Sequence, residues 1–147
     1  MERRSQNEVL TDEIAMPANA GSISTLTKFI TDHARAGFND EKVHAIGLAA
    51  EEALQNIICF ACPEGFGEIR VSCTFHDSGS LIINIVDSGV PFNMLLADTF
   101  QETQDFFEPG KIPSTKLMKK AIKNIEYRRG TDINTLVFTI SPDKVTK

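Results

Sequence analysis

The chain has few of the features that would point to a membrane or to the extracellular space. Its 147 residues contain no tryptophan, one tyrosine and three cysteines. No apolar run approaches the roughly 20 residues that a membrane span needs. The amino-terminal segment, MERRSQNEVLTDEI, lacks the apolar core of a signal peptide. We therefore expect a cytoplasmic protein with no membrane partner.

Positive charge is also scarce. Fifteen Lys and Arg stand against 20 Asp and Glu, which gives a formal net charge of −5. General binding to nucleic acid needs an excess of cations, so this balance argues against a direct nucleic-acid partner. One basic row near the carboxyl end is an exception, although such rows are more often a solvated helix face. It contains Lys116, Lys119, Lys120, Lys123, Arg128 and Arg129.

The three cysteines give no clear sign of redox chemistry or of a metal site. Cys59 and Cys62 are spaced as CxxC, but they come at the end of a long apolar segment. Redox pairs normally open a helix, where the helix dipole lowers a thiol pKa. No second CxxC and no nearby His pair completes a zinc site. The favoured interpretation is that they are small apolar helix residues.

The pattern of apolar residues predicts one α+β domain over residues 1–147, with residues 1–7 frayed. Alternating segments indicate strands, and segments with apolar residues three and four apart indicate helices. The order strand, two helices, two strands, loop, helix, two strands predicts a two-layer α/β sandwich. Its sheet would be mixed but mostly antiparallel, with the helices on one face. Strands are expected at 9–16, 67–75, 81–86, 125–129 and 134–140, and helices at about 22–37, 40–62 and 114–124.

Four polar residues interrupt the otherwise apolar stretch between Ala45 and Cys62 of the second predicted helix. They are Glu51, Glu52, Gln55 and Asn56. One interpretation is that they form its solvated face. In the other, Glu52 and Asn56, one turn apart, point into a cleft. An amide oxygen would then suit Mg²⁺, and a carboxylate would accept a proton from an attacking hydroxyl. Spacing alone leaves both interpretations open.

The second notable stretch is the hexapeptide DSGVPF, which directly follows an apolar strand. It places a carboxylate, Asp87, at the edge of the sheet. Gly89 has no side chain, so a flat ligand could approach the backbone there. A carboxylate accepts a hydrogen bond from an amino group such as that of adenine. Viewed alone, the hexapeptide is equally consistent with a simple Asp-Ser-Gly turn.

Taken together, these segments resemble the ATP-binding domain of the GHKL superfamily, which has the histidine-kinase-like ATPase, or Bergerat, fold. The closest resemblance is to the anti-sigma-factor serine/threonine kinases, and it covers residues 10–141. GLAAEEALQNII is similar to their helix motif, with Glu52 and Asn56 in the E-x-x-x-N positions. DSGVPF is similar to their D-x-G-x-P-F box at Asp87, Gly89, Pro91 and Phe92.

The resemblance implies a role for each matching residue. Asn56 would bind the Mg²⁺ that bridges the phosphates of ATP, and Glu52 would be the general base for a substrate hydroxyl. Asp87 would hydrogen-bond the adenine amine, Gly89 would give the base room, and Thr135 would support this contact through water.

The region that should cover the phosphates, about 98–114, departs from the family pattern. A Gly-x-Gly-type motif is usual before the last helix, but here the sequence reads EPGKIPST. Gly110 is one lid glycine, Ser114 stands where a second is expected, and Pro113 lacks an amide donor. Ser114 and Thr115 would still hold phosphates. A further departure is Phe60, which stands where the family usually has His.

The resemblance therefore implies a kinase that phosphorylates an anti-sigma-factor antagonist and controls a sigma factor, often as a homodimer. The alternative is a regulatory module of the same fold that binds a protein partner with weak or no catalysis. Retention of Glu52 favours the kinase. The Pro113-Ser114 lid favours the module.

Overall fold

The computed structural model describes residues 11–96 and 113–142, and in these ranges five strands form one sheet of order β1-β2-β3-β5-β4. Each pair of neighbouring strands is antiparallel. This confirms the expected α+β class, with a sheet more regular than the mixed one predicted. The strands are β1 (Thr11–Pro17), β2 (Glu68–Phe75), β3 (Leu81–Asp87), β4 (Asn124–Gly130) and β5 (Ile133–Ile140).

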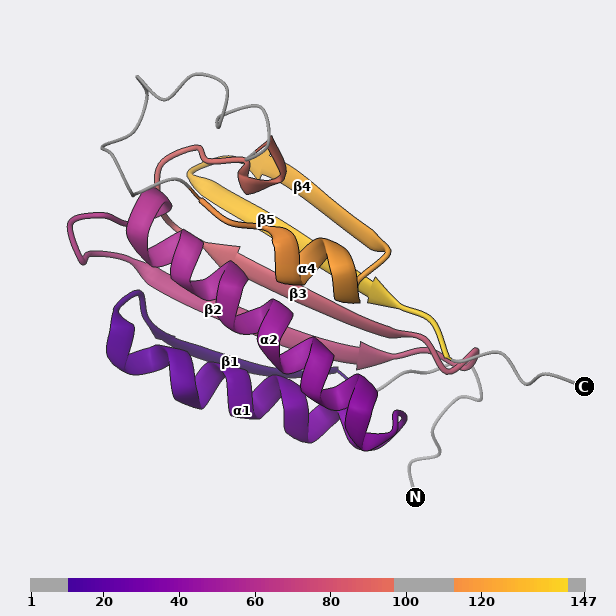
Figure 1. The fold of residues 1–147 in the computed structure, drawn as a ribbon. Helices are drawn as coiled ribbons and strands as arrows, with labels where there is room; N and C mark the ends of the chain where they lie inside the picture. Colours follow the sequence, from indigo (N-terminus) through magenta and orange to yellow (C-terminus); the bar gives the residue numbers. More distant parts are fainter. Residues whose placement is uncertain (1–10, 97–112, 143–147) are drawn as a thin grey trace, which may run out of the picture.

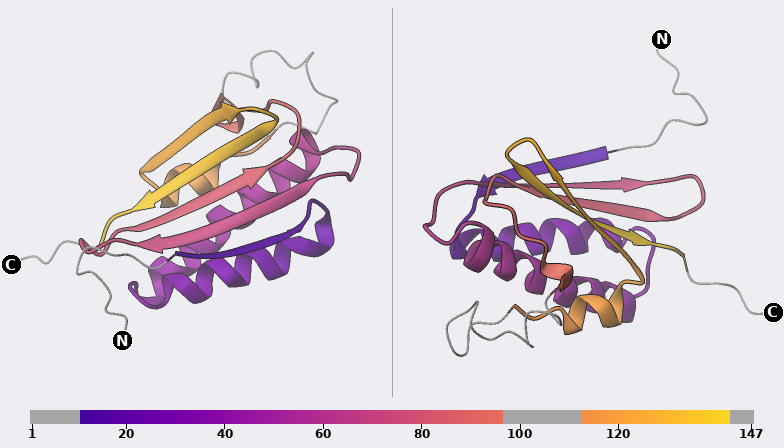
Figure 2. Two further views of the ribbon diagram at one scale, coloured as in Figure 1. Left: turned by 180° about the vertical axis from the view of Figure 1, so that it is seen from behind. Right: turned by 90° about the horizontal axis from the view of Figure 1, so that it is seen from above.

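The described helices cover one face of this sheet (Figures 1 and 2). Two 3₁₀ turns, η1 (Ala20–Ser22) and η3 (Met94–Leu96), connect elements. No described helix has the length and apolar character needed to cross a bilayer. The helices are α1 (Ile23–Ala34), α2 (Asp40–Asn56), its π-helical continuation η2 (Ile57–Ala61), and α4 (Lys116–Ala121).

Helix α2 is the central element of the helical layer, and it packs against both α1 and α4. Its start follows the sequence, because the side chain of Asn39 accepts a hydrogen bond from the Lys42 amide at 2.8 Å. Asp40 and Glu41 lie in the first turn, where the helix dipole favours negative charge. Ile46, Ala50, Ala53 and Leu54 are fully buried.

Buried and more exposed side chains alternate along the central strands, as the sequence predicts. The buried side chains of β2 and β3 recur every second residue and meet the helices, and β5 follows the same pattern except that Val137 is buried as well. They include Ile69, Val71, Ile83, Ile85, Leu136 and Phe138. This register fixes which residues at the strand ends face the helical layer.

Helix α4 is shorter than the expected 114–124. It begins after Thr115, whose side chain makes no capping hydrogen bond, and the backbone is already extended at Ile122. Most of the expected lid, about 98–114, lies in residues 97–112, which the structure does not describe. Gly110 therefore lies outside the described residues.

Candidate functional site

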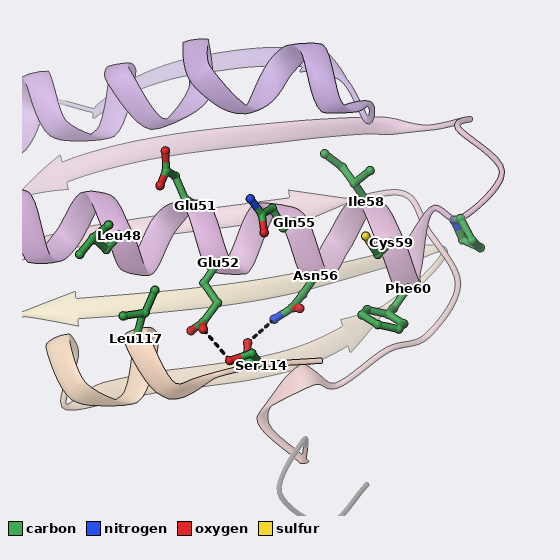
Figure 3. A pocket seen from close by; sticks show the side chains of 11 residues that line it. Leu48, Glu51, Glu52, Gln55, Asn56, Ile58, Cys59, Phe60, Ser114 and Leu117 are labelled. Atoms are coloured by element: carbon green, nitrogen blue, oxygen red, sulfur yellow. Dashed lines mark hydrogen bonds between the residues drawn. The ribbon is translucent and has the colours of Figure 1, made fainter. Parts of the chain in front are cut away.

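The four polar residues in the second half of α2 divide into two pairs. Glu51 and Gln55 are exposed, whereas Glu52 and Asn56 are only 9% and 6% exposed. A uniformly solvated face would expose all four. Glu52 and Asn56 instead point toward the segment that precedes α4 (Figure 3). The structure thus favours the interpretation in which these two side chains share a site.

Both carboxylate oxygens of Glu52 accept hydrogen bonds from that segment. The Ser114 hydroxyl donates to Oε2 at 2.8 Å, and the Met118 amide donates to Oε1 at 2.9 Å. Met118 is the third residue of α4, so its amide is one of those left unpaired at the start of a helix. Glu52 therefore caps α4 from a neighbouring helix, where its negative charge is favourable.

Asn56 is the last residue of α2 before the π-helical turn. Its Nδ2 donates to the carbonyl oxygen of Ser114 at 2.8 Å and lies 3.6 Å from the sulfur of Met94. Within the described residues its Oδ1 accepts no hydrogen bond, and that atom is the hard oxygen ligand that the sequence suggested for Mg²⁺. Asn56 thus fixes the segment before α4 with one end of its amide.

A cavity of about 640 Å³ lies beside these side chains, between α2 and α4. Its size is in the range of small-molecule sites. Glu52, Asn56 and Ser114 line it, together with Phe60 and Leu117. Asp87 is not among its lining residues.

Asp87 ends β3 and is only 3% exposed. Its Oδ1 accepts from the Gly89 amide and from Nδ2 of Asn134, each at 2.9 Å. Burial raises the pKa of this carboxyl group, while the hydrogen bonds from Asn134 and Gly89 and the charge of Arg129 oppose that rise. Within the described residues Oδ2 accepts no hydrogen bond. It is the oxygen available to a ligand.

Asn134 is a residue of this candidate site that the sequence did not point to. Its Nδ2 also donates to the carbonyl of Val90 at 2.8 Å, and its Oδ1 accepts from the Phe92 amide at 3.3 Å and from the Tyr127 hydroxyl. Both donors and both acceptor positions are used. Asn134 therefore ties Asp87, the following loop and β4 together.

Thr135, which was expected to support the adenine contact of Asp87, is one position away from the residue that pairs with Asp87. Asp87 pairs with Asn134, whereas Thr135 pairs with Val86. Successive residues of a strand face opposite sides of the sheet, so Thr135 faces away from Asp87 and the helical layer. The only sequence signal for Asn134 was its place at the start of the strand expected at 134–140. That signal becomes informative only when the β3–β5 register is known.

Gly89 is required by a contact inside the protein. A Cβ atom placed there would lie 2.2 Å from the carbonyl oxygen of Ala61, and the Val90 amide donates to that same oxygen at 2.9 Å. The missing side chain lets the DSGVPF loop close on the end of η2. The sequence suggested that Gly89 leaves space for a ligand, but on this side the backbone of Ala61 fills that space.

The remaining predicted residues lie around these two groups. Phe92 stacks on Phe60 with ring centroids 5.3 Å apart, so the residue at the usual His position holds the DSGVPF loop. Pro91 is exposed and Thr115 is buried. In the described ranges no His, Cys, Asp and Glu residues cluster as a metal site, and the three cysteines are free.

The structure therefore forms two groups of residues. Glu52, Asn56 and Ser114 form one at the cavity, and Asp87, Gly89 and Asn134 form the other at the sheet edge. The loop after Asp87 connects them, because Met94 near its end contacts Asn56.

Comparisons with known proteins agree with this arrangement. A crystal structure of the RsbU and RsbW domains of Rv1364c from Mycobacterium tuberculosis is similar, with a TM-score of 0.62 at 14% identity. The match covers 93% of this chain and 35% of that chain, and at this identity it shows the fold alone. No curated protein matches the chain. A sequence model described as the histidine kinase-like ATPase domain matches residues 16–140. The chain belongs to the histidine kinase-like ATPase domain family.

Proposed function

We propose that the chain is an ATP-binding, Mg²⁺-dependent serine/threonine protein kinase of the anti-sigma-factor type. It would regulate a sigma factor by phosphorylating an anti-sigma-factor antagonist. The observation that carries the proposal is the buried pair Glu52 and Asn56 beside a cavity, with a serine hydroxyl already hydrogen-bonded to the carboxylate. This is the contact that a general base needs with a hydroxyl substrate.

The available acceptor atoms fit a magnesium nucleotide. Oδ1 of Asn56 is a hard ligand for Mg²⁺, and Mg²⁺ would neutralise charge on the phosphates during transfer. Oδ2 of Asp87 would accept from the adenine amine, and Asn134 would orient that carboxylate in place of Thr135. Ser114, Thr115 and Gly110 would contact phosphates.

Glu52 would take the proton from the partner's hydroxyl group. Its orientation is already fixed, because the Met118 amide holds Oε1 while Oε2 faces Ser114. A partner hydroxyl would therefore replace the hydroxyl of Ser114 at Oε2. Positioned proton transfer of this kind contributes roughly 10²- to 10⁴-fold to a rate.

The test is transfer of label from ATP labelled at its γ-phosphate to anti-sigma-factor antagonists encoded in the same genome. We expect one antagonist to be labelled on serine or threonine, and only with Mg²⁺ present. If the chain binds ATP but labels none of them, kinase activity toward this class is contradicted.

One structural observation favours the second candidate, a regulatory module with weak or no catalysis. Glu52 and Asn56 are both engaged by the segment around Ser114, which also carries Pro113. In such a module Glu52→Gln would leave the affinity for the partner unchanged. The module would also transfer no phosphate label from ATP to that partner. Co-sedimentation of partner and chain, with and without ATP, separates the two candidates and reports any homodimer.

A further inference from the structure

Ser114 contacts both residues that the proposed function places at the reacting phosphate. Its hydroxyl donates to Oε2 of Glu52 at 2.8 Å, and its carbonyl accepts from Nδ2 of Asn56 at 2.8 Å. Figure 3 shows both contacts at the wall of the cavity. One serine of the chain itself thus occupies the position where a protein substrate would present its hydroxyl.

The distance is suitable for proton transfer. A general base must lie about 2.6–3.2 Å from the atom whose proton it takes, and the Ser114–Glu52 contact meets this. Ser114 is exposed and lines the cavity, while Pro113 and Thr115 on either side are buried. The neighbours anchor the segment and leave the serine side chain at the cavity.

Asn56 can serve Ser114 and a cation at the same time, because its amide has two ends. Nδ2 holds the Ser114 carbonyl, and Oδ1 accepts no hydrogen bond from the described residues. A cation on Oδ1 would therefore leave the contact between Asn56 and Ser114 in place. Ser114 would stay beside Glu52 when the site is loaded.

We propose that Ser114 is a site of autophosphorylation. This inference rests on the proposed function, because the phosphoryl donor is the nucleoside triphosphate of that function. Glu52 takes the proton of the Ser114 hydroxyl as Oγ bonds to the γ-phosphorus. The bond from that phosphorus to the β–γ bridging oxygen breaks, and the nucleoside diphosphate leaves with the electron pair.

The modification would also change the protein after the nucleotide has gone. A phosphoserine has no hydroxyl proton to donate to Glu52 and brings a charge of about −1.5 to −2 beside that carboxylate. Repulsion moves Glu52 away from Ser114 and weakens its second contact, to the Met118 amide. The start of α4 therefore loses its cap, and Glu52 becomes available to a partner's hydroxyl.

The experiment incubates the full chain with Mg²⁺-ATP and maps phosphate by peptide mass spectrometry. Nucleotide binding is measured on the same samples by thermal shift. The variants are Ser114→Ala, Ser114→Thr and Glu52→Gln, with Ser24→Ala as the matched control at an exposed serine of α1. The nucleotide is then removed, and hydrogen exchange at the Met118 amide is compared between phosphorylated and unmodified protein.

We expect phosphate on residue 114 in the wild type, in Ser114→Thr and in Ser24→Ala, and at least 10²-fold less in Glu52→Gln. We also expect faster exchange at Met118 in the phosphorylated, nucleotide-free protein. A thermal shift without phosphate on Ser114 overturns this inference and leaves the proposed function standing. No thermal shift and no phosphate overturns both. Phosphate on Ser114 that persists undiminished in Glu52→Gln contradicts the assigned base.

Discussion

Glu52 and Asn56 line a cavity of about 640 Å³, whereas Asp87 is enclosed by Asn134 and by the loop that follows it. The first group is held by a segment far away in the sequence, through Ser114 and Met118. The second is held by a compact network in which each donor and acceptor of Asn134 is used. The cavity end therefore has atoms that a substrate can displace, and the sheet-edge end has a fixed carboxylate. Under the proposed function, the first group would carry the chemistry and the second would recognise the adenine base.

The largest expected effect is on phosphoryl transfer at the cavity end. Glu52→Gln keeps the shape of the side chain but removes its basicity, so transfer to the partner should fall by about 10²- to 10⁴-fold. Initial rates with labelled ATP measure it. The matched control is Glu41→Gln, an exposed carboxylate in the first turn of the same helix and away from the cavity, which should transfer at the wild-type rate. Equal losses in both variants would show that Glu52 has no special role.

The next effect is on stability at the sheet-edge end. Asn134→Ala leaves Asp87, the Val90 carbonyl and the Tyr127 hydroxyl without their shared partner, and each buried unpaired group costs roughly 1–3 kcal/mol. We expect the free energy of unfolding to fall by about 3 kcal/mol in urea titrations.

Thr135→Ala is the control for that variant, because Thr135 lies in the same strand but faces the other side of the sheet. It should cost less than about 1 kcal/mol. Equal costs for the two variants would contradict the network described for Asn134.

These two residues also show what the sequence can and cannot predict. Alternation in 67–75, a mostly apolar run in 81–86 and a turn between them were sufficient to predict that these two strands are neighbours, as β2 and β3 are. The partner of Asp87 depends on how β5 lies against β3, and a shift of one residue exchanges the faces of a strand. The family resemblance pointed to Thr135, and only the register between β3 and β5 shows that Asn134 is the partner of Asp87.

Long-range contacts limit the prediction in the same way at the cavity end. The helix pattern identified Glu52 and Asn56, but their burial comes from Ser114 and Met118, about 60 residues further along the chain (separations of 58 to 66). The length of α4 was overestimated at both ends, since the helix begins after Thr115 and the backbone is already extended at Ile122. The spacing of apolar residues in the local sequence predicts the helices and strands. Which side chains meet depends on tertiary contacts that this spacing does not contain.

A smaller effect is expected where the sheet-edge loop closes on η2. In Gly89→Ala the new methyl group would meet the backbone of Ala61, which cannot rotate away, so overpacking should cost about 1–3 kcal/mol. Gly21→Ala is the control, because its nearest neighbour is the Asn19 side chain at 3.2 Å. Urea unfolding of both variants measures the difference. A Gly89→Ala protein as stable as the control would show that the loop is not closed on Ala61.

The smallest expected effect is the dependence of stability on pH at Asp87. Burial raises its pKa above the usual 3.8, so between 3.8 and the folded-state pKa the native protein binds more protons than the unfolded chain. Stability relative to Asp87→Asn should therefore fall as the pH rises through this window. Urea unfolding of both proteins from pH 3.5 to about 7 measures this difference.

Asp32 should show the opposite pH dependence to Asp87, because its hydrogen bond with Lys28 lowers its pKa. Its contribution to stability, relative to Asp32→Asn, should be lost as the pH falls, which is the opposite sign. Asp32 is at the surface, so added salt should weaken its effect. If the contributions of both residues to the free energy of unfolding changed with pH in the same direction, the burial of Asp87 would be contradicted.

The proposed function requires the two groups to form opposite ends of one nucleotide site. Thermal unfolding with and without Mg²⁺-ATP, on wild type and Asp87→Asn, tests this requirement. Nucleotide at about 100 times its dissociation constant should add about 2.7 kcal/mol of stability, and the midpoint should rise by roughly 5–10 °C. In Asp87→Asn the rise should disappear, because the adenine amine loses its charged acceptor. An unchanged wild-type midpoint at millimolar ATP, or an equal rise in Asp87→Asn, would contradict this requirement.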